Sequence, residues 1–253
     1  MALTWADKRR FYVIGGAVLI GIALLTVFAI SILYEAPSCM DQKLNQDEAG
    51  IDCGGSCAYL CAHEVQEPRI TFARTIENGN GRTDVIAYIE NRNQTAEAKG
   101  ARYTVEVFDE SGTLLGKREG MLDLPARSTV SLFVPGIYQG IGAAPRAFIS
   151  FAEDTDWRNA RGGENAIAVS QADLVLGEKP RVNVILSNSA PTALYNKTII
   201  ATVFDQTGVA IAASQTVVRE IAGLGTATAV FTWNQPFQGT PARVEVTSVP
   251  TLP

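Results

Sequence analysis

The feature that most constrains this chain is an uncharged, strongly apolar run from Phe11 to Tyr34. Its 24 residues would extend roughly 36 Å as an α-helix, enough to cross a hydrocarbon core of about 30 Å with some tilt. A buried core helix of a soluble protein is the alternative reading. Such helices usually have one polar face, whereas this run is apolar all round. The run therefore predicts a transmembrane helix over residues 11–34.

Flanking charges predict how this helix is oriented. Lys8, Arg9 and Arg10 precede the run and Glu35 follows it. Because basic residues stay on the cytoplasmic side, we expect residues 1–10 to form a cytoplasmic tail, with all that follows the helix exported. A cleaved signal peptide is the rival, but its apolar part usually spans about 7–15 residues before a small-residue cleavage site. The prediction is an uncleaved, single-pass anchor in the cytoplasmic membrane, with cleavage left open.

Four cysteines follow the apolar run within a short polar segment: Cys39, Cys53, Cys57 and Cys61. On the exported side of a membrane, an even number of cysteines in so short a stretch predicts disulfides, here two. Three pairings are open. Zinc bound by four thiolates and free thiols are the alternatives, although zinc ligands usually come in closer pairs than Cys39 and Cys53. We expect a disulfide-bonded collar over residues 35–66.

The same segment holds oxygen-bearing side chains that calcium could use: Asp41, Asn45, Asp47 and Asp52. Calcium takes six to eight oxygen ligands, often from one acidic loop. The spacing does not fit the twelve-residue helix-loop-helix register. Asn, Asp and Gly are also ordinary turn residues, so a solvated acidic loop without metal is the other reading. Calcium is the single cofactor that the sequence suggests, and both readings stay open.

The stretch from Cys39 to Cys57, which ends in Asp52-Cys53-Gly54-Gly55-Ser56-Cys57, resembles a short DCGGxC-type cysteine-rich motif of bacterial surface-anchored and secreted proteins. The resemblance implies an extracellular module rather than an enzyme site. It departs from the motif at Met40-Asp41-Gln42, where an Asp-Gly pair is usual, so ligand roles do not transfer residue by residue.

The rest of the chain contains an internal repeat of two similar units. The segment 105–112 (VEVFDESG) answers 201–208 (ATVFDQTG) at an offset of 96. Upstream, the alternating positions before Asn91 match those before Asn188 at an offset of 97. Downstream, residues 130–134 match 227–231. Three strands therefore recur in the same order, as in a tandem repeat.

Each matched block alternates apolar and polar residues, the period of a half-buried strand. Asp109 to Gly112 and Asp205 to Gly208 read as hairpin turns, so neighbouring strands are antiparallel. The fold predicted is mainly β: two tandem, antiparallel, immunoglobulin-like β-sandwiches at 67–160 and 161–253. We expect a linker at 156–164 and Trp233 in the core. Trp157 is a candidate for an exposed contact or for packing between the two sandwiches.

The repeated strand with its aromatic-Asp turn, together with Asn91 and Asn188, resembles FxLYD-type immunoglobulin-like domains of bacterial envelope proteins. Val105 and Ala201 replace the Phe of that pattern, and Val107 and Val203 replace its Leu. The resemblance covers both repeats and implies the sandwich fold and an envelope setting.

Composition excludes several functions. A net charge of −5, from 26 acidic and 21 basic residues, provides no basic field for nucleic acid. The single histidine, His63, leaves few general bases, so we expect no enzyme. The expectation is a non-enzymatic structural or interaction protein of the cell envelope, an adhesion or scaffold protein with other envelope proteins as partners. The alternatives are an accessory subunit of a membrane secretion or pilus-type complex and a hydrolase with an unrecognised site. The oligomeric state is open.

Overall fold

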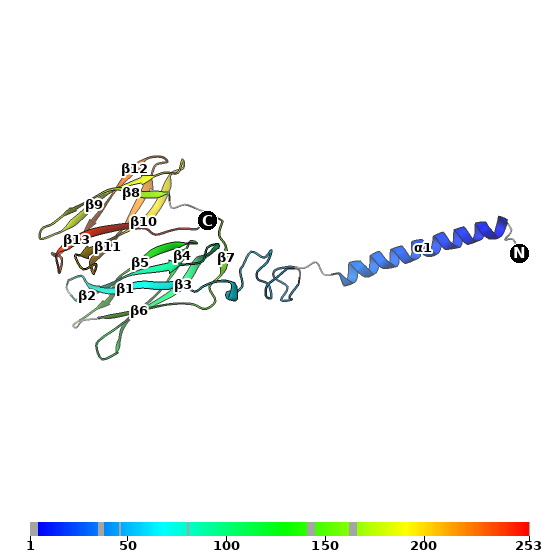
Figure 1. Ribbon diagram of the computed structural model, residues 1–253, viewed down its shortest axis with the longest axis horizontal. Coiled ribbons are helices and arrows are strands. Elements are labelled where there is room, and N and C mark those ends of the chain that lie inside the picture. The colour runs from blue at the N-terminus through cyan, green and yellow to red at the C-terminus, as the bar shows by residue number, and fades with distance from the viewer. Residues whose placement is uncertain are drawn as a thin grey trace.

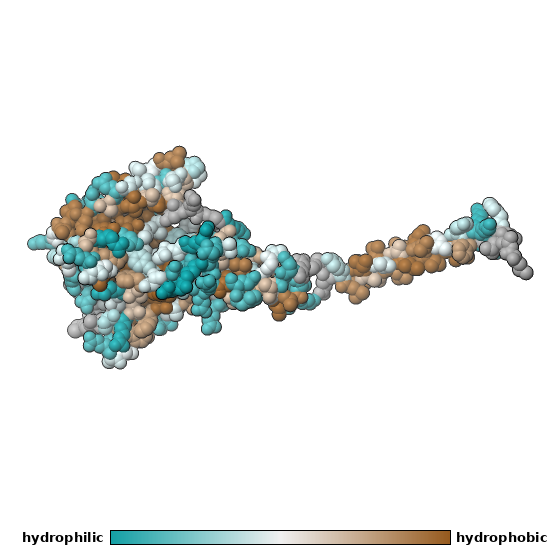
Figure 2. Space-filling view, in the orientation of Figure 1, coloured by the Kyte–Doolittle hydropathy of each residue, from teal (hydrophilic) through white to brown (hydrophobic). Residues whose placement is uncertain are grey.

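The computed structural model describes residues 5–34, 38–45, 47–79, 81–140, 145–161 and 166–252. Its first element, α1 (Trp5–Leu33), contains a candidate membrane span, Lys8–Leu33, with a mean hydropathy of 2.7 and no buried residues. Figure 2 shows apolar side chains along this helix. The helix begins before the predicted 11–34 and takes in Lys8, Arg9 and Arg10, because long basic side chains are good helix formers. A helix of this kind serves as a membrane anchor or as a signal sequence.

Beyond the collar, which contains the short 3₁₀-helix η1 (Ala62–Glu64), the chain is almost entirely β, as predicted. The first sandwich packs sheet β1-β2-β5 on sheet β4-β3-β6. All strand pairs in these sheets are antiparallel. The strands of this sandwich are β1 (Arg69–Glu77), β2 (Arg82–Asn91), β3 (Ala96–Phe108), β4 (Leu114–Leu124), β5 (Ser128–Gln139), β6 (Arg146–Phe151) and β7 (Trp157–Asn159).

The second sandwich repeats this topology, which confirms the internal repeat. Sheet β12-β9-β8 corresponds to sheet β5-β2-β1, and sheet β11-β10-β13 corresponds to sheet β4-β3-β6. Both predicted turns join hairpins, β3 to β4 and β10 to β11. The strands of this sandwich are β8 (Ile167–Val175), β9 (Arg181–Asn188), β10 (Leu194–Asp205), β11 (Ala210–Ile221), β12 (Thr226–Thr232) and β13 (Pro241–Ser248).

Matched polar residues hold the two copies in the same way. Asn91 is 1% exposed, and its amide nitrogen donates to three backbone carbonyls at 2.9–3.1 Å. Asn188 is 2% exposed and contacts the three corresponding carbonyls, those of Thr192, Ile221 and Ala222. Each amide oxygen accepts a backbone N–H two residues on. Since buried carbonyls need partners, each asparagine fastens three segments of its sandwich together.

The hairpin aspartates also match. The carboxylate of Asp109 accepts hydrogen bonds from Ser111 Oγ and Thr113 N–H, and Asp205 accepts them from Thr207 and Val209 N–H. The hydroxyl of Ser111 is the largest cause of the lowered pKa of Asp109, and that of Thr207 plays the same part for Asp205. Turn closure therefore explains both aspartates, as the sequence predicts.

Trp157 differs from the expectation. It is not an exposed linker residue but begins β7, which pairs with the start of β3, and it is 6% exposed within the core of the first sandwich. Arg158 next to it forms a 3.0 Å ion pair with buried Glu97. A strand of three residues is too short to show a period in the sequence, so its burial is set by the β3 partner. Trp233 is buried in the second core, as expected.

The two sandwiches pack face to face rather than end to end. A third apolar cluster joins the outer face of sheet β1-β2-β5 to the outer face of sheet β11-β10-β13. Phe204 is stacked on Tyr88 with ring centroids 6.4 Å apart, and Phe72 lies 6.3 Å from Phe204. Figure 1 shows the two sandwiches side by side, with the strands of the second sandwich above those of the first. We refer to this contact as the inter-sandwich interface.

The residues after β13 return to the first sandwich and strengthen this interface. Val249 packs against the first core and the interface cluster, and the Leu252 N–H donates to Asp123 Oδ2 at 2.6 Å. Thr247 and Ser131 hydroxyls hydrogen-bond at 2.9 Å across the interface. The C-terminal segment therefore lies beside the first sandwich, next to β4.

Candidate functional site

The collar is closed by two disulfides, as predicted. Cys39 pairs with Cys57 and Cys53 with Cys61, which selects one of the three possible pairings. The two-glycine turn is required here, because a Cβ on Gly55 (φ +57°) would come within 2.1 Å of the Asp47 carbonyl oxygen. The turn at Gly54-Gly55 thus reverses the chain and lets Cys57 reach Cys39. So short a segment buries little apolar surface, and covalent closure supplies its order.

The collar is docked on the first sandwich. Leu60 N–H donates to the Trp157 carbonyl at 2.8 Å, and Tyr59 forms an isolated bridge with Arg158. Gln66 and Asn93 exchange two hydrogen bonds of 2.7 and 2.8 Å. The side chains of Leu60 and Val65 pack against the first core. These contacts combine burial with satisfied polar groups, so the collar and the first sandwich form one unit. Asn93 is consequently buried.

The predicted calcium ligands are engaged in hydrogen bonds within the collar. Asp52 accepts the N–H groups of Asp41 and Gln42, and Asp41 accepts Asn45 Nδ2 at 2.8 Å. Burial of Asp41 opposes ionisation, but hydrogen bonds lower the pKa of its carboxyl, the first being the N–H of Lys43. Ser56 Oγ donates to Asp47 at 2.8 Å and lowers the pKa of Asp47. The structure thus brings Asp41, Asn45 and Asp52 together, while Asp47 faces the glycine turn.

Calcium binding by this loop stays a prediction with a direct test. If the four side chains hold calcium, excess chelator should lower the melting temperature of the collar, since a ligand stabilises the state it binds. Asp52→Asn should abolish that shift. Hydrogen exchange of residues 38–61, recorded at increasing temperature with and without calcium, measures both effects. An unchanged exchange profile contradicts the calcium reading and favours the acidic loop.

Within the described part of the collar, one group has ligand atoms close enough for a metal: Cys39, Glu48 and Cys57. Its two sulfur atoms form a disulfide, so they are not thiolate ligands. His63 is exposed in η1, two residues after the disulfide-bonded Cys61. These groups offer no thiolate or imidazole pair for catalysis.

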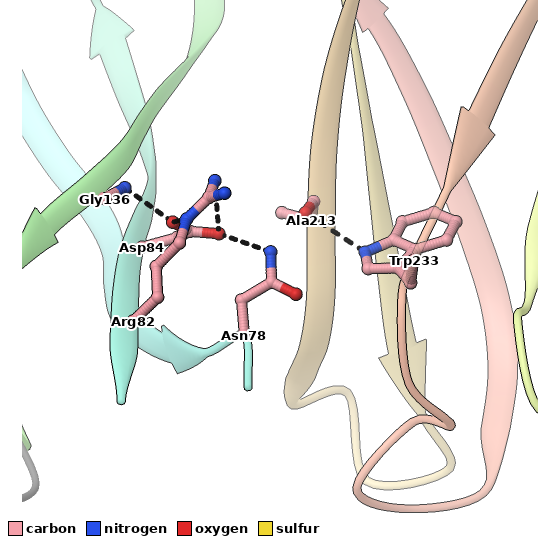
Figure 3. Close-up of polar contacts among 6 residues, drawn as sticks. All are labelled: Asn78, Arg82, Asp84, Gly136, Ala213 and Trp233. Atoms are coloured by element: carbon pink, nitrogen blue, oxygen red, sulfur yellow. Dashed lines mark hydrogen bonds and ion pairs between the residues drawn. The ribbon is translucent and has the colours of Figure 1, made fainter. Parts of the chain in front are cut away.

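A buried carboxylate stands at the end of the first sandwich that lies away from the collar. Asp84 has a fully buried side chain, and it accepts hydrogen bonds from Arg82 Nε at 2.8 Å, Asn78 Nδ2 at 2.8 Å and Gly136 N at 2.6 Å. Figure 3 shows these partners converging on one carboxylate, and it also draws Trp233 of the second sandwich. The Trp233 indole donates to the Ala213 carbonyl at 3.2 Å. Because Asp84 is fully partnered, it fits a structural role in closing the β1–β2 turn.

The outer face of sheet β4-β3-β6 carries an open hollow of about 580 Å³. It is lined by one basic side chain, one acidic side chain, two hydroxyl side chains and one long apolar side chain: Arg102, Glu119, Thr104, Ser150 and Met121. The cross-strand register places them in two adjacent rows, Met121 opposite Arg102 and Glu119 opposite Thr104, with Ser150 on the far side of Thr104. The second sandwich contacts the other sheet, β1-β2-β5, so this face is not part of the inter-sandwich interface.

Reasoning from the sequence did not single out Asp84 or this hollow, and it named Asn91 and Asn188 without predicting that each holds three segments of its sandwich together. Asn91 and Asn188 had a signal, because they occupy matching positions of the repeat at the end of an apolar strand. Asp84 had a weaker one, as a charge just before the apolar run of β2. The hollow depends on which strands become neighbours, so no local pattern marks it.

No family model matches the sequence, and no curated protein matches it. The resemblances to the cysteine-rich motif and to FxLYD-type domains therefore stay predictions. Similar solved structures include a transglutaminase of red sea bream, with 15% identity over 75% of this chain and a TM-score of 0.24. A β-glucuronidase of Bacteroides uniformis has 13% identity over 62% of this chain and a TM-score of 0.21.

A GH2 β-galacturonidase from Eisenbergiella tayi has 11% identity over 66% of this chain and a TM-score of 0.20. This chain covers 32%, 22% and 36% of those three proteins. At such TM-scores the similarity carries no argument about family or activity.

Proposed function

We propose that this protein is a non-enzymatic, membrane-anchored component of the bacterial cell envelope that acts by structure and contact. In this proposal α1 crosses the cytoplasmic membrane with the N-terminus inside, and the collar and both sandwiches stand on the outer side. The partners are other envelope proteins. An accessory role in a secretion or pilus-type complex is one form of the same proposal, with α1 as a further contact.

The observation that carries the proposal is the position of the two disulfides directly after an apolar helix. Disulfides persist in oxidising compartments and are rare in the cytosol. The basic residues Lys8, Arg9 and Arg10 favour a cytoplasmic N-terminus. The docking of the collar on the first sandwich would fix the sandwiches close above the membrane surface.

The composition of the described residues supports a role without catalysis. The histidine is exposed, the cysteines are paired, and the buried carboxylates Asp84 and Glu97 are held in ion pairs. General acid–base and nucleophilic catalysis need groups that can exchange protons or electrons with a substrate. In this proposal the protein acts by holding its two sandwiches rigidly outside the membrane, where partners can contact them. Screening the purified chain against a broad set of substrates tests the non-enzymatic part.

Orientation can be tested with single added cysteines and a membrane-impermeant maleimide. Glu110→Cys places a thiol on the exposed β3–β4 hairpin, and Thr4→Cys places one before the helix. We expect Glu110→Cys to react in cells whose outer barrier is permeabilised, and Thr4→Cys to react after lysis alone. Alkylation before reduction, followed by mass spectrometry, should recover both native disulfides. Labelling of Thr4→Cys in unlysed cells, or four reduced native cysteines, contradicts the proposal.

A further inference from the structure

The internal repeat allows the hollow on sheet β4-β3-β6 to be compared with its own duplicate. In the second sandwich, strand pairing aligns Ile200 with Gln215 and Thr247, as it aligns Thr104 with Glu119 and Ser150 in the first. Ile200 is buried in the inter-sandwich interface. The fold therefore accepts a large apolar residue at this position. The first sandwich has a threonine there instead, and a hollow lined by polar groups results.

The charges around the hollow are already paired. Arg102 forms an ion pair with Asp154, and Lys117 Nζ lies 3.0 Å from Glu119 Oε1. These pairs make the rim neutral overall, so the hollow does not favour a strongly charged ligand. Each group still has hydrogen-bonding capacity, because a guanidinium has five donors and a carboxylate accepts several hydrogen bonds. The hollow thus offers donors and acceptors side by side.

Hydroxyl groups and Met121 complete the lining, and Phe148 lies just outside it. Thr104 and Ser150 present hydroxyl side chains in the middle of the hollow. Met121 is 70% exposed on one side, and Phe148 is 59% exposed one row away on the other. The volume of 580 Å³ lies within the range of about 300–1,000 Å³ that is usual for ligand sites. The backbone groups of β3 are used in pairing β4 and β6, so a ligand must be recognised through side chains.

We propose that this hollow binds an oligosaccharide built from N-acetylated amino sugars. An acetamido group has an N–H that Glu119 can accept, a carbonyl that Arg102 can contact, and a methyl that fits against Met121. The ring hydroxyls match Thr104 and Ser150, and the apolar face of a neighbouring ring matches Phe148. A site open across the sheet would admit a chain rather than a single sugar.

The experiment uses the full chain in lipid nanodiscs, because sugar-headed detergents would compete for the site. The probe is the N-acetylglucosamine hexamer, and binding is measured by calorimetry and by saturation-transfer NMR. We expect a dissociation constant of about 1 mM or lower. Transfer should be strongest at the acetamido methyl protons.

Two variants locate the site. Ser150→Arg fills the hollow and should abolish binding, whereas Thr228→Arg makes the same kind of change on an exposed edge strand, β12, and should leave binding unchanged. Glu119→Gln should weaken binding by about 10-fold or more, since hydrogen bonds to charged groups contribute roughly 1.5–3 kcal/mol. Native-like hydrogen exchange of both sandwiches confirms that each variant folds.

The outcomes separate this proposal from the proposed function. Absence of binding up to about 10 mM, tighter binding of a peptide of equal length, or equal effects of Ser150→Arg and Thr228→Arg would each overturn the oligosaccharide site. None of these results depends on which side of the membrane the sandwiches face. Cleavage of the hexamer would instead contradict the non-enzymatic role while leaving the site in place.

Discussion

Replacing Asn188 by alanine should lower the free energy of unfolding of the second sandwich by about 3–4 kcal/mol, since each buried partner left unpaired costs roughly 1–3 kcal/mol. The change removes the amide that contacts the carbonyls of Thr192, Ile221 and Ala222, and it leaves the Ala190 N–H without its acceptor. Hydrogen exchange read by mass spectrometry measures the effect strand by strand.

Asn183→Ala is the matched control. Asn183 lies on the same strand but on its solvent-facing side, half-buried, so its replacement should change stability by less than about 0.5 kcal/mol. Asn91→Ala should destabilise the first sandwich in parallel and also loosen the collar, because Asn91 holds Asn93, which holds Gln66. Equal exchange in the Asn188→Ala and Asn183→Ala chains would refute this role.

The second large effect is expected at the inter-sandwich interface. Phe204→Asp places a charge among Phe72, Tyr88 and the aliphatic residues of the third cluster. Removing a buried phenylalanine alone costs about 3–5 kcal/mol, and an unpaired buried charge adds to this. We expect the sandwiches to separate while each keeps its own core. Small-angle scattering should report a larger radius of gyration, and amides of β1 and β11 should exchange faster.

The repeat supplies the control for this experiment. Phe108 occupies the position in β3 that Phe204 occupies in β10, but it lies half-buried on the outer face, beside Phe148. Phe108→Asp should therefore leave the radius of gyration unchanged. If both variants scatter alike and neither differs from the unchanged chain, the interface does not hold the sandwiches together.

Much of the fold was accessible from local patterns. The apolar run predicts α1 because a helix of that composition has no polar face, and the period-two blocks predict the strands of both repeats. The sequence of β2 also indicates that sheet β1-β2-β5 is covered on both of its faces, by the first core and by the inter-sandwich interface. Val85-Ile86-Ala87-Tyr88-Ile89 in β2 is apolar on both sides, which is typical of a strand covered on both faces.

Other features were beyond local reasoning. The disulfide pairing depends on the path that Gly54-Gly55 gives the collar, and three pairings satisfy the same spacing. Trp157 stands in a polar segment, and its burial is decided by the distant strand β3. The hollow requires β3, β4 and β6 to be neighbours before its lining residues meet. Tertiary partners decide all three.

The side-by-side layering of the sheets sets how far the molecule can reach. The equivalent strands of both sandwiches run from the collar end to the opposite end, so the second sandwich adds breadth and almost no height (Figure 1). The 13 residues of β3 span about 43 Å at roughly 3.3 Å per residue. Because the sandwiches lie side by side, the second sandwich does not lengthen the molecule. A partner of this body therefore meets it nearer to α1 than it would meet a beaded arrangement of the same two units.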